Sequence, residues 1–597
     1  MDAEKSATTA EGTSLGRPNT DLNTDSNTDQ NTDQTTDQNT DQNTDQHTDG
    51  SNTPATVSPA SNEEVAKAIS TAHRLLIVGS IAIVVFIGSL DSSIVSTLNP
   101  TLVAEFNSGK DYGWYGAAFL LVVGATLPLM GKLTSVFQPK TVFLSSLVIL
   151  EVGCLICALA RNSPTFIVGR AFAGLGDAGV LSSGLTITAR ISPLQHRAMY
   201  TSIVGGLEGV ATIVGPTIGG ALVNTIGWRW GFWINLPAGG VLFAILVFFF
   251  HPPSQKPSDS QAAQKTTWQK LRELDFIGAI AIMGSLVSLL LALQWGGTTY
   301  PWSNGRIIAL LVIFGVSFGL VGVYESRLGN AAIFPTRLLR DKAFVAVILF
   351  GFTISSGMWA ILYYLPTWFQ AVQRVSAGEA GIRLVPLTIA EVVASTVTGV
   401  GTSYVGYLPP FVIAATVLSS IGTGLLYTLY PGSPEGQWLG YQIICGAGFG
   451  IAIQQSIVNA QAIVADDDVG YAISAVLLGN IVGGSVVIGI SQALFASEVL
   501  TLVGRFPGIG ADTLLNHFRT LDEVLSPQDL EVAVQTYNTA LNKVFLLALI
   551  LCSISALSWP FIPWKSLKSE AKAPEKTESS SSVPISESEI EAATPNP

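Results

Sequence analysis

The chain has 597 residues, enough for several soluble domains, but its composition is typical of a membrane protein. Apolar residues make up 48% of the chain and charged residues only 12%, with a mean hydropathy of +0.46. The formal charge of -12 does not describe one surface, because much of the acid lies near the two ends. These values favour a polytopic membrane protein over a soluble enzyme, and they predict no nucleic-acid partner.

Both ends of the chain differ from its body. From Asn19 to Gly50 the sequence repeats the tetrad NTDQ and close variants, with almost no apolar side chain. Such a segment cannot bury enough apolar surface to offset the entropy of ordering. Residues 1–72 are therefore predicted to form a disordered N-terminal tail, and the serine-rich residues 564–597 a disordered C-terminal tail.

Between the tails, the chain is expected to cross a membrane about fourteen times, because a spanning helix needs roughly 20 mainly apolar residues. This predicts an all-α integral membrane protein. The candidate spans fall near residues 75–98, 113–132, 141–160, 166–188, 200–222, 232–250, 276–294, 306–324, 344–369, 384–402, 410–430, 437–463, 471–496 and 542–562.

Lysine and arginine flank these spans unevenly. One side carries about twice as many as the other, which predicts that both termini lie in the cytoplasm. The N-terminus lacks the pattern of a cleaved signal peptide, so the first span is expected to direct insertion. The longest loops are a cytoplasmic connector at 251–275 and a non-cytoplasmic stretch at 498–541, which is expected to form short helices.

The sequence offers little for enzymatic chemistry. The phosphate-binding pattern G-x-x-x-x-G-K-[ST] does not occur, so ATP is not expected to drive the protein directly. The histidines do not cluster in the spans, and the four cysteines fit small buried apolar residues better than a disulfide or a metal site. We therefore predict no enzyme activity, no metal and no cofactor.

Ionisable side chains within the predicted spans are candidate functional residues, because each costs about 2.5–3.5 kcal/mol on insertion and faces protein or water. They are Asp91, Glu151, Arg170, Asp177, Glu208 and Glu391. Arg170 and Asp177 lie on one face of the fourth span, separated by about 10 Å along the helix. Arg170 could pair with Asp91 or Glu208 in one conformation and release it in another; the alternative is a permanent structural ion pair.

The fifth span combines a polar face with glycine. Glu208 and Thr212 recur at helical spacing with Gly215 and Gly219, which form a G-x-x-x-G pair that lets another backbone approach closely. Pro216 removes a backbone donor and bends the helix at this contact. The alternative is a general packing face of small residues.

Candidate cavity-lining residues are aromatic and neutral polar side chains of the ninth and twelfth spans: Trp359, Tyr363, Gln442, Gln454 and Gln455. Aromatic rings can line a site for a flat apolar ligand. For the glutamines, polar contact between helices is the alternative. The neighbouring Trp368 and Phe369 are expected in the interfacial belt of the membrane.

Four stretches of the sequence resemble family motifs in the same order. They are LDSSIVSTLNPTL at Leu90–Leu102, IVGRAFAGLGDAG at Ile167–Gly179, ATIVGPTIGGAL at Ala211–Leu222 and WRWGFWINLPAG at Trp228–Gly239. Together they resemble the major facilitator superfamily, in particular its fourteen-span drug:proton antiporter branch, which includes fungal toxin and multidrug exporters.

This resemblance implies a major facilitator fold in which two six-helix halves rock about a central cavity, with two extra spans between them. The implied parts are the first half at 73–250, the connector with spans 7 and 8 at 251–342, and the second half at 343–563. The resemblance also assigns Arg170 to proton coupling, with Asp91 as the acid of the first span. Glu208 is our third candidate for proton coupling.

The antiporter motif of the fifth span is expected to close the cavity against leaks through its bend at Gly215 and Pro216. Its candidate packing residues are Ala211, Gly215, Pro216, Gly219 and Gly220. The loop after the second span departs from the family pattern. Gly131 and Lys140 are kept, but Ser135 stands at the usual aspartate, so a charge-based latch is not expected in this loop.

We therefore predict a secondary active transporter that exports small amphipathic or apolar compounds by proton-coupled alternating access. Its expected partners are the small-molecule cargo, protons and the lipid bilayer of the plasma membrane or the vacuole, with no obligate protein partner. One alternative is an importer or vacuolar transporter of siderophores, amino acids or similar solutes. The second is a membrane receptor or scaffold that does not transport.

Overall fold

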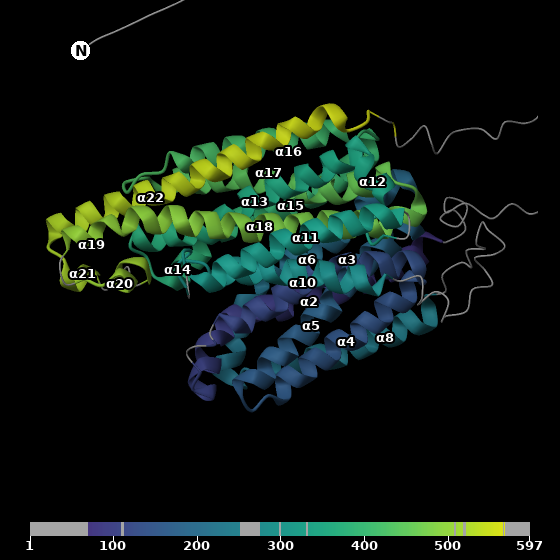
Figure 1. Ribbon diagram of the computed structural model, residues 1–597, viewed down its shortest axis with the longest axis horizontal. Helices are drawn as coiled ribbons and strands as arrows, with labels where there is room; N and C mark the ends of the chain where they lie inside the picture. The colour runs from purple at the N-terminus through teal and green to yellow at the C-terminus, as the bar shows by residue number, and fades with distance from the viewer. Residues whose placement is uncertain are drawn as a thin grey trace, which may run out of the picture. The chain divides into compact units, whose positions relative to one another are not determined.

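The computed structural model describes residues 70–108, 111, 113–250, 275–297, 300–329, 332–506, 509–516, 521–564 and 566. The predictions for the two tails and for the 251–275 connector lie almost entirely outside these residues. Figure 1 shows long helices running side by side. In the first part of the chain they are α2 (Thr71–Phe106), α3 (Trp114–Val136), α4 (Pro139–Leu159), α5 (Ser163–Ile191), α6 (Arg197–Thr225), α7 (Trp230–Trp233) and α8 (Asn235–Phe249).

A pair of helices and a second series follow. The pair is α10 (Phe276–Trp295) and α11 (Gly305–Leu328). The series comprises α12 (Thr336–Arg340), α13 (Lys342–Ala371), α14 (Ala377–Arg383), α15 (Val385–Val405), α16 (Pro409–Tyr427), α17 (Glu435–Ile463), α18 (Val469–Val499), α19 (Thr501–Arg505), α20 (Ala511–Asn516), α21 (Leu521–Val524) and α22 (Pro527–Ile554). Within the described residues, three short 3₁₀ helices lie at Leu194–His196, Asp466–Asp468 and Ser555–Phe561.

Thirteen of the described helices are long and apolar enough to cross a membrane. The remaining predicted span is α5, whose 29 residues include Arg170, Asp177 and several glycines that lower its hydropathy. It packs against α2, α3 and α4, so its polar residues face protein. The predicted all-α, multi-pass membrane fold is confirmed. The short helices α19 to α21 lie in the predicted loop at 498–541, but the loop is shorter than predicted, because the long helix α22 already begins at Pro527.

The buried apolar side chains form two large cores. One draws on α2 to α8, which we call the first helix group, with a few residues from α17 and α18. The other draws on α12 to α22, which we call the second helix group. Helix α10 packs against α3 of the first group and α18 of the second. The division of the chain at residues 250 and 343 stays a prediction.

Glycines bring α4 and α5 into backbone contact. A Cβ atom added at Gly176 would lie 2.3 Å from the backbone nitrogen of Leu150, and one added at Gly153 would lie 2.3 Å from that of Ala173. Lipid tails are as apolar as the helix surfaces, so helices in a membrane associate mainly through such close packing. This contact holds α5, the helix that carries Arg170, in a fixed register against α4.

We predict that Gly176→Ala lowers the thermal unfolding midpoint of the purified protein, because the added methyl group must push α4 and α5 apart. Overpacking of this kind costs about 1–3 kcal/mol. The matched control is Gly79→Ala on α2, where an added Cβ meets no atom within 4 Å. Equal unfolding midpoints for the two variants would contradict the packing argument.

Candidate functional site

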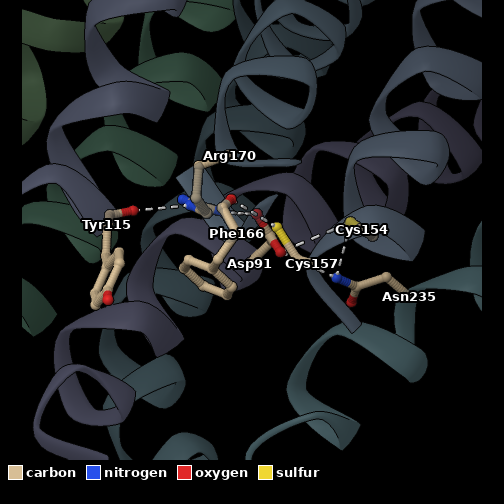
Figure 2. Close-up of polar contacts among 7 residues, drawn as sticks. All are labelled: Asp91, Tyr115, Cys154, Cys157, Phe166, Arg170 and Asn235. Atoms are coloured by element: carbon tan, nitrogen blue, oxygen red, sulfur yellow. Dashed lines mark hydrogen bonds and ion pairs between the residues drawn. The ribbon is translucent and has the colours of Figure 1, made fainter. Parts of the chain in front are cut away.

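A buried ion pair joins α2 and α5 inside the first helix group. Arg170 Nη1 donates to Asp91 Oδ2, and each of these residues is 1% exposed or less. Arg170 Nε donates to the backbone oxygen of Tyr115 at 3.1 Å. The guanidinium also lies over the ring of Phe119, 4.4 Å from its centroid. Figure 2 shows Arg170 extended between Tyr115 and Asp91.

Two further helices supply donors to the other oxygen of Asp91. Cys154 Sγ on α4 donates to Asp91 Oδ1 at 3.7 Å, and Asn235 Nδ2 at the start of α8 donates to the same atom at 3.5 Å (Figure 2). Removing two charges from water costs several kcal/mol per ion, and extra hydrogen bonds to the pair reduce this cost. The site therefore requires α2, α3, α4, α5 and α8 to converge.

The sequence predicts that Arg170 pairs with either Asp91 or Glu208, and the structure pairs it with Asp91. The sequence pattern does not indicate Cys154 and Asn235 as partners of this carboxylate. Cys154 was interpreted only as a small apolar residue. Asn235 lies within the motif Trp228–Gly239, which identified the family but suggested no role for the asparagine.

The other predicted acids extend from this pair toward the second helix group. Asp177 Oδ1 lies 2.2 Å from the position of a Cβ atom added at Gly88, so this face of α5 packs on α2. Asp177 is close enough to Asp91 and Glu208 for their negative charges to repel. Glu208 on α6 is in turn close enough to repel Glu391 on α15. The ionisable groups thus form a series that crosses from one helix group to the other.

The glycines of α6 pack against α2. A Cβ atom added at Gly215 would lie 2.4 Å from Ser93 Cβ, and one at Gly219 would lie 2.2 Å from Thr97 Oγ1. Ala211 is fully buried, whereas a Cβ atom at Gly220 meets nothing within 4 Å. The close approach therefore depends on Gly215 and Gly219 and not on Gly220.

Pro216 lies inside α6, one turn after Thr212. As proline has no N–H, it leaves the backbone oxygen of Thr212 without its usual helical donor. Ser93 Oγ of α2 donates to this oxygen at 3.3 Å. The break in the α6 hydrogen-bond ladder is thus satisfied by the neighbouring helix, as membrane-spanning helices require.

Polar contacts join the two helix groups where α2 and α6 begin and α5 ends, which we call the Arg197 end. Arg197 Nη2 pairs with Asp466 Oδ1 at 3.0 Å, and its Nη1 donates to the backbone oxygen of Gln461 at 3.3 Å. Ser182 and Ser474 share a hydrogen bond of 2.8 Å. The Arg197–Asp466 pair was missed, although the run Asp466–Asp468 directly before a predicted span was a visible signal.

The retained loop residues lie near the Arg197 end. A Cβ atom added at Gly131 would lie 2.8 Å from Ser474 of α18, so Gly131 allows close contact between the helix groups. Lys140 Nζ donates to the backbone oxygens of Val247 and Phe250 at the end of α8. Ser135 Oγ donates to a backbone oxygen of its own helix at 2.8 Å.

The candidate cavity residues occupy different environments. Gln454 Nε2 donates to Ala198 O across the two helix groups at 2.9 Å, and Gln455 Nε2 donates to Thr402 Oγ1 at 2.8 Å. Gln442 is fully buried. Among the described atoms its amide has no hydrogen-bond partner. The contacts of Gln454 and Gln455 fit the alternative of polar packing between helices.

The aromatic candidates of α13 differ in exposure. Trp359 packs on α18, where a Cβ atom at Gly484 would lie 2.4 Å from its ring, while Tyr363 is 57% exposed. The expected interfacial position of Trp368 and Phe369 is wrong, because both are fully buried. Trp368 Nε1 donates to Asn538 Oδ1 of α22 at 2.8 Å, so this helix end packs on protein and not on lipid.

Comparison with known proteins agrees with this architecture. Residues 81–488 match the family model of the Major Facilitator Superfamily. The chain belongs to the Major Facilitator Superfamily. It is 52% identical over 510 residues to efflux pump apf11 of Gibberella fujikuroi, covering 85% of this chain and 91% of that protein. It is 46% identical over 516 residues to the MFS-type transporter TOXA of Cochliobolus carbonum, covering 86% of this chain and 94% of that one.

A solved structure supports the fold. The proton:xylose symporter XylE bound to 6-bromo-6-deoxy-D-glucose aligns with a TM-score of 0.53 at 15% identity, covering 84% of this chain and all of that one. The predicted major facilitator fold is thereby confirmed. The family and the two relatives also confirm the prediction of an efflux transporter and not an enzyme.

We predict that Gly215→Ala lowers the transport rate severalfold, because the added methyl group would meet Ser93 and separate α6 from α2. Gly220→Ala on the same helix is the control, since its methyl group enters open space. Transport of a fluorescent cargo from vesicles, normalised to the amount of folded protein, measures the difference. Wild-type rates for Gly215→Ala would show that the close approach does not matter.

Proposed function

We propose that the protein exports small amphipathic or apolar molecules, such as secondary metabolites or toxins, in exchange for protons. The names of the relatives, an efflux pump and the transporter TOXA, support the direction of transport and the class of cargo. The observation that carries the proton coupling is the buried Asp91–Arg170 pair with Asp177 and Glu208 nearby. Ionisable groups at this depth are costly and mark ion pathways.

In this mechanism, the proton and Arg170 compete for Asp91. A proton on Asp91 removes the negative charge that holds the guanidinium, so the pair weakens and α2 and α5 can repack. Deprotonation restores the pair. Cargo that binds better to one arrangement shifts the same equilibrium, so the movement of cargo and the movement of protons become linked.

We further propose that the Arg197 end faces the cytoplasm, that both termini lie there, and that the membrane is the plasma membrane. The positive-inside rule supports this orientation. The Arg197–Asp466 pair and the Ser182–Ser474 hydrogen bond then hold the cytoplasmic side closed. Cargo loading requires these contacts to separate, while Gly215 and Pro216 keep α6 packed on α2 and limit leakage.

The test of this proposal is a transport assay in vesicles with an imposed pH gradient and a panel of dyes, fungicides and secondary metabolites. We predict that Arg170→Ala abolishes gradient-driven movement. The control is Arg229→Ala, which removes a half-buried arginine paired with Glu105 at 2.8 Å. Unchanged coupled flux in Arg170→Ala would remove this residue from the mechanism.

The folding of the variants must be checked separately, because Arg170→Ala leaves Asp91 buried without its partner. Breaking a buried pair in this way costs about 3–5 kcal/mol. The double variant Asp91→Asn with Arg170→Gln removes both charges and is expected to recover most of this stability. It should still fail to couple cargo to protons, so full coupled flux in the double variant would contradict the proposal.

A further inference from the structure

Glu151 on α4 holds a buried carboxyl group that has no hydrogen-bond partner among the described residues. Both of its carboxyl oxygens are inaccessible to solvent. Asp91, by contrast, has donors on both oxygens. A carboxylate that is ionised, buried and unpaired is so costly that the group takes up a proton instead. The surroundings of Glu151 therefore favour the neutral acid, which carries one proton.

The start of α8 holds Glu151 in this position. A Cβ atom added at Gly239 would lie 1.7 Å from Glu151 Oε1, so a larger residue at this position would displace the carboxyl. One turn earlier on α8, Asn235 Nδ2 donates to both Asp91 Oδ1 and Cys154 Sγ. Glu151 and Cys154 are in turn separated by one turn of α4. The motif Trp228–Gly239 thus packs the unpaired acid beside the Asp91–Arg170 pair.

Among the residues that the structure describes, few charged or titratable groups lie near Glu151. From α2, Asp91 is near enough for its charge to act on Glu151, and on α4 itself Cys154 lies one turn away. Helix α5 contributes Arg170, through its pair with Asp91. Helix α7, which also packs on α4, has no ionisable residue, and α8 supplies only the neutral Asn235 and Gly239 at this contact.

We propose that Glu151 is a second proton-carrying residue, which supplies the proton that separates Asp91 from Arg170. In this step the O–H bond of Glu151 breaks and an O–H bond forms on Asp91, directly or through one bridging water. Glu151 becomes the carboxylate, and Arg170 loses its charged partner. A hydronium ion from water entering the site then restores the proton on Glu151. Asp91 later releases its own proton to water and pairs with Arg170 again, so one proton is taken up and one is released in each cycle.

This assignment rests on the proposed proton-coupled function and adds a residue that the family motifs do not indicate. The competing explanation is that Glu151 is a neutral packing residue that never ionises. The two explanations differ for glutamine, which has nearly the same shape as neutral glutamic acid but cannot release a proton. A packing role is preserved in Glu151→Gln, whereas a proton-carrying role is lost.

The experiment compares wild type, Glu151→Gln and Glu325→Gln in vesicles. Glu325 on α11 is a suitable control because it also has a buried carboxyl oxygen without a partner in the described structure. Its ionisable neighbours, Asp275 and Lys132, do not include Asp91. Two quantities are measured from low to high pH: cargo accumulation driven by a pH gradient, and cargo exchange at equilibrium without a gradient.

We expect Glu151→Gln to keep cargo exchange while its gradient-driven accumulation falls at least about tenfold, a modest loss for a proton-transfer group. Its accumulation should also lose the pH dependence of the wild type. Glu325→Gln should behave as wild type. A wild-type pH profile and accumulation in Glu151→Gln would overturn the assignment of Glu151. Wild-type protein that does not respond to the gradient would overturn the proposed function instead.

A conservative variant covers the case in which Glu151→Gln does not fold. Glu151→Asp keeps a titratable carboxyl group. Its side chain is shorter by one methylene, so the carboxyl lies farther from Gly239. If Glu151 carries a proton, this variant retains coupling and its pH profile shifts relative to the wild type. If its pH profile coincides with that of the wild type, the carboxyl does not titrate during transport and the assignment is wrong.

Discussion

The buried ion pair between Asp91 and Arg170 is the interaction on which the rest of this structure depends. Two charges inside a membrane protein are tolerated only if they satisfy each other and their remaining donors and acceptors. Here Tyr115, Cys154 and Asn235 provide those contacts. The convergence of α2, α3, α4, α5 and α8 is thus a requirement of this pair, and the glycines that allow their close packing are part of the same site.

The helices are held by two kinds of contact, close packing at glycines around the ion pair and polar contacts between the two helix groups. Around Asp91, backbone packing at Gly153, Gly176 and Gly215 holds the helices in fixed register. Between the two groups, the Arg197 end relies on ion pairs and hydrogen bonds such as Arg197–Asp466. Polar contacts of this kind exchange readily for water, so one end can open without loss of the helix packing that keeps the ionisable groups in place.

Much of the fold was predictable because the bilayer imposes length and polarity on each helix. The sequence also revealed Asp91 and Arg170, since charges stand out in apolar spans. It could not reveal that Asn235 and Cys154 contact Asp91, because these contacts depend on the packing of helices distant in sequence. Trp368 was misplaced for a related reason: hydropathy locates a helix end but not the direction in which its side chains face.

The central claim is that Asp91 changes its proton occupancy when cargo binds. The most direct test is to add a transported compound to purified protein in weakly buffered solution and measure proton release. The account predicts that the wild type releases protons on binding and that Asp91→Asn binds the compound without releasing them. Binding by the wild type with no proton release at any pH at which it transports would contradict the account.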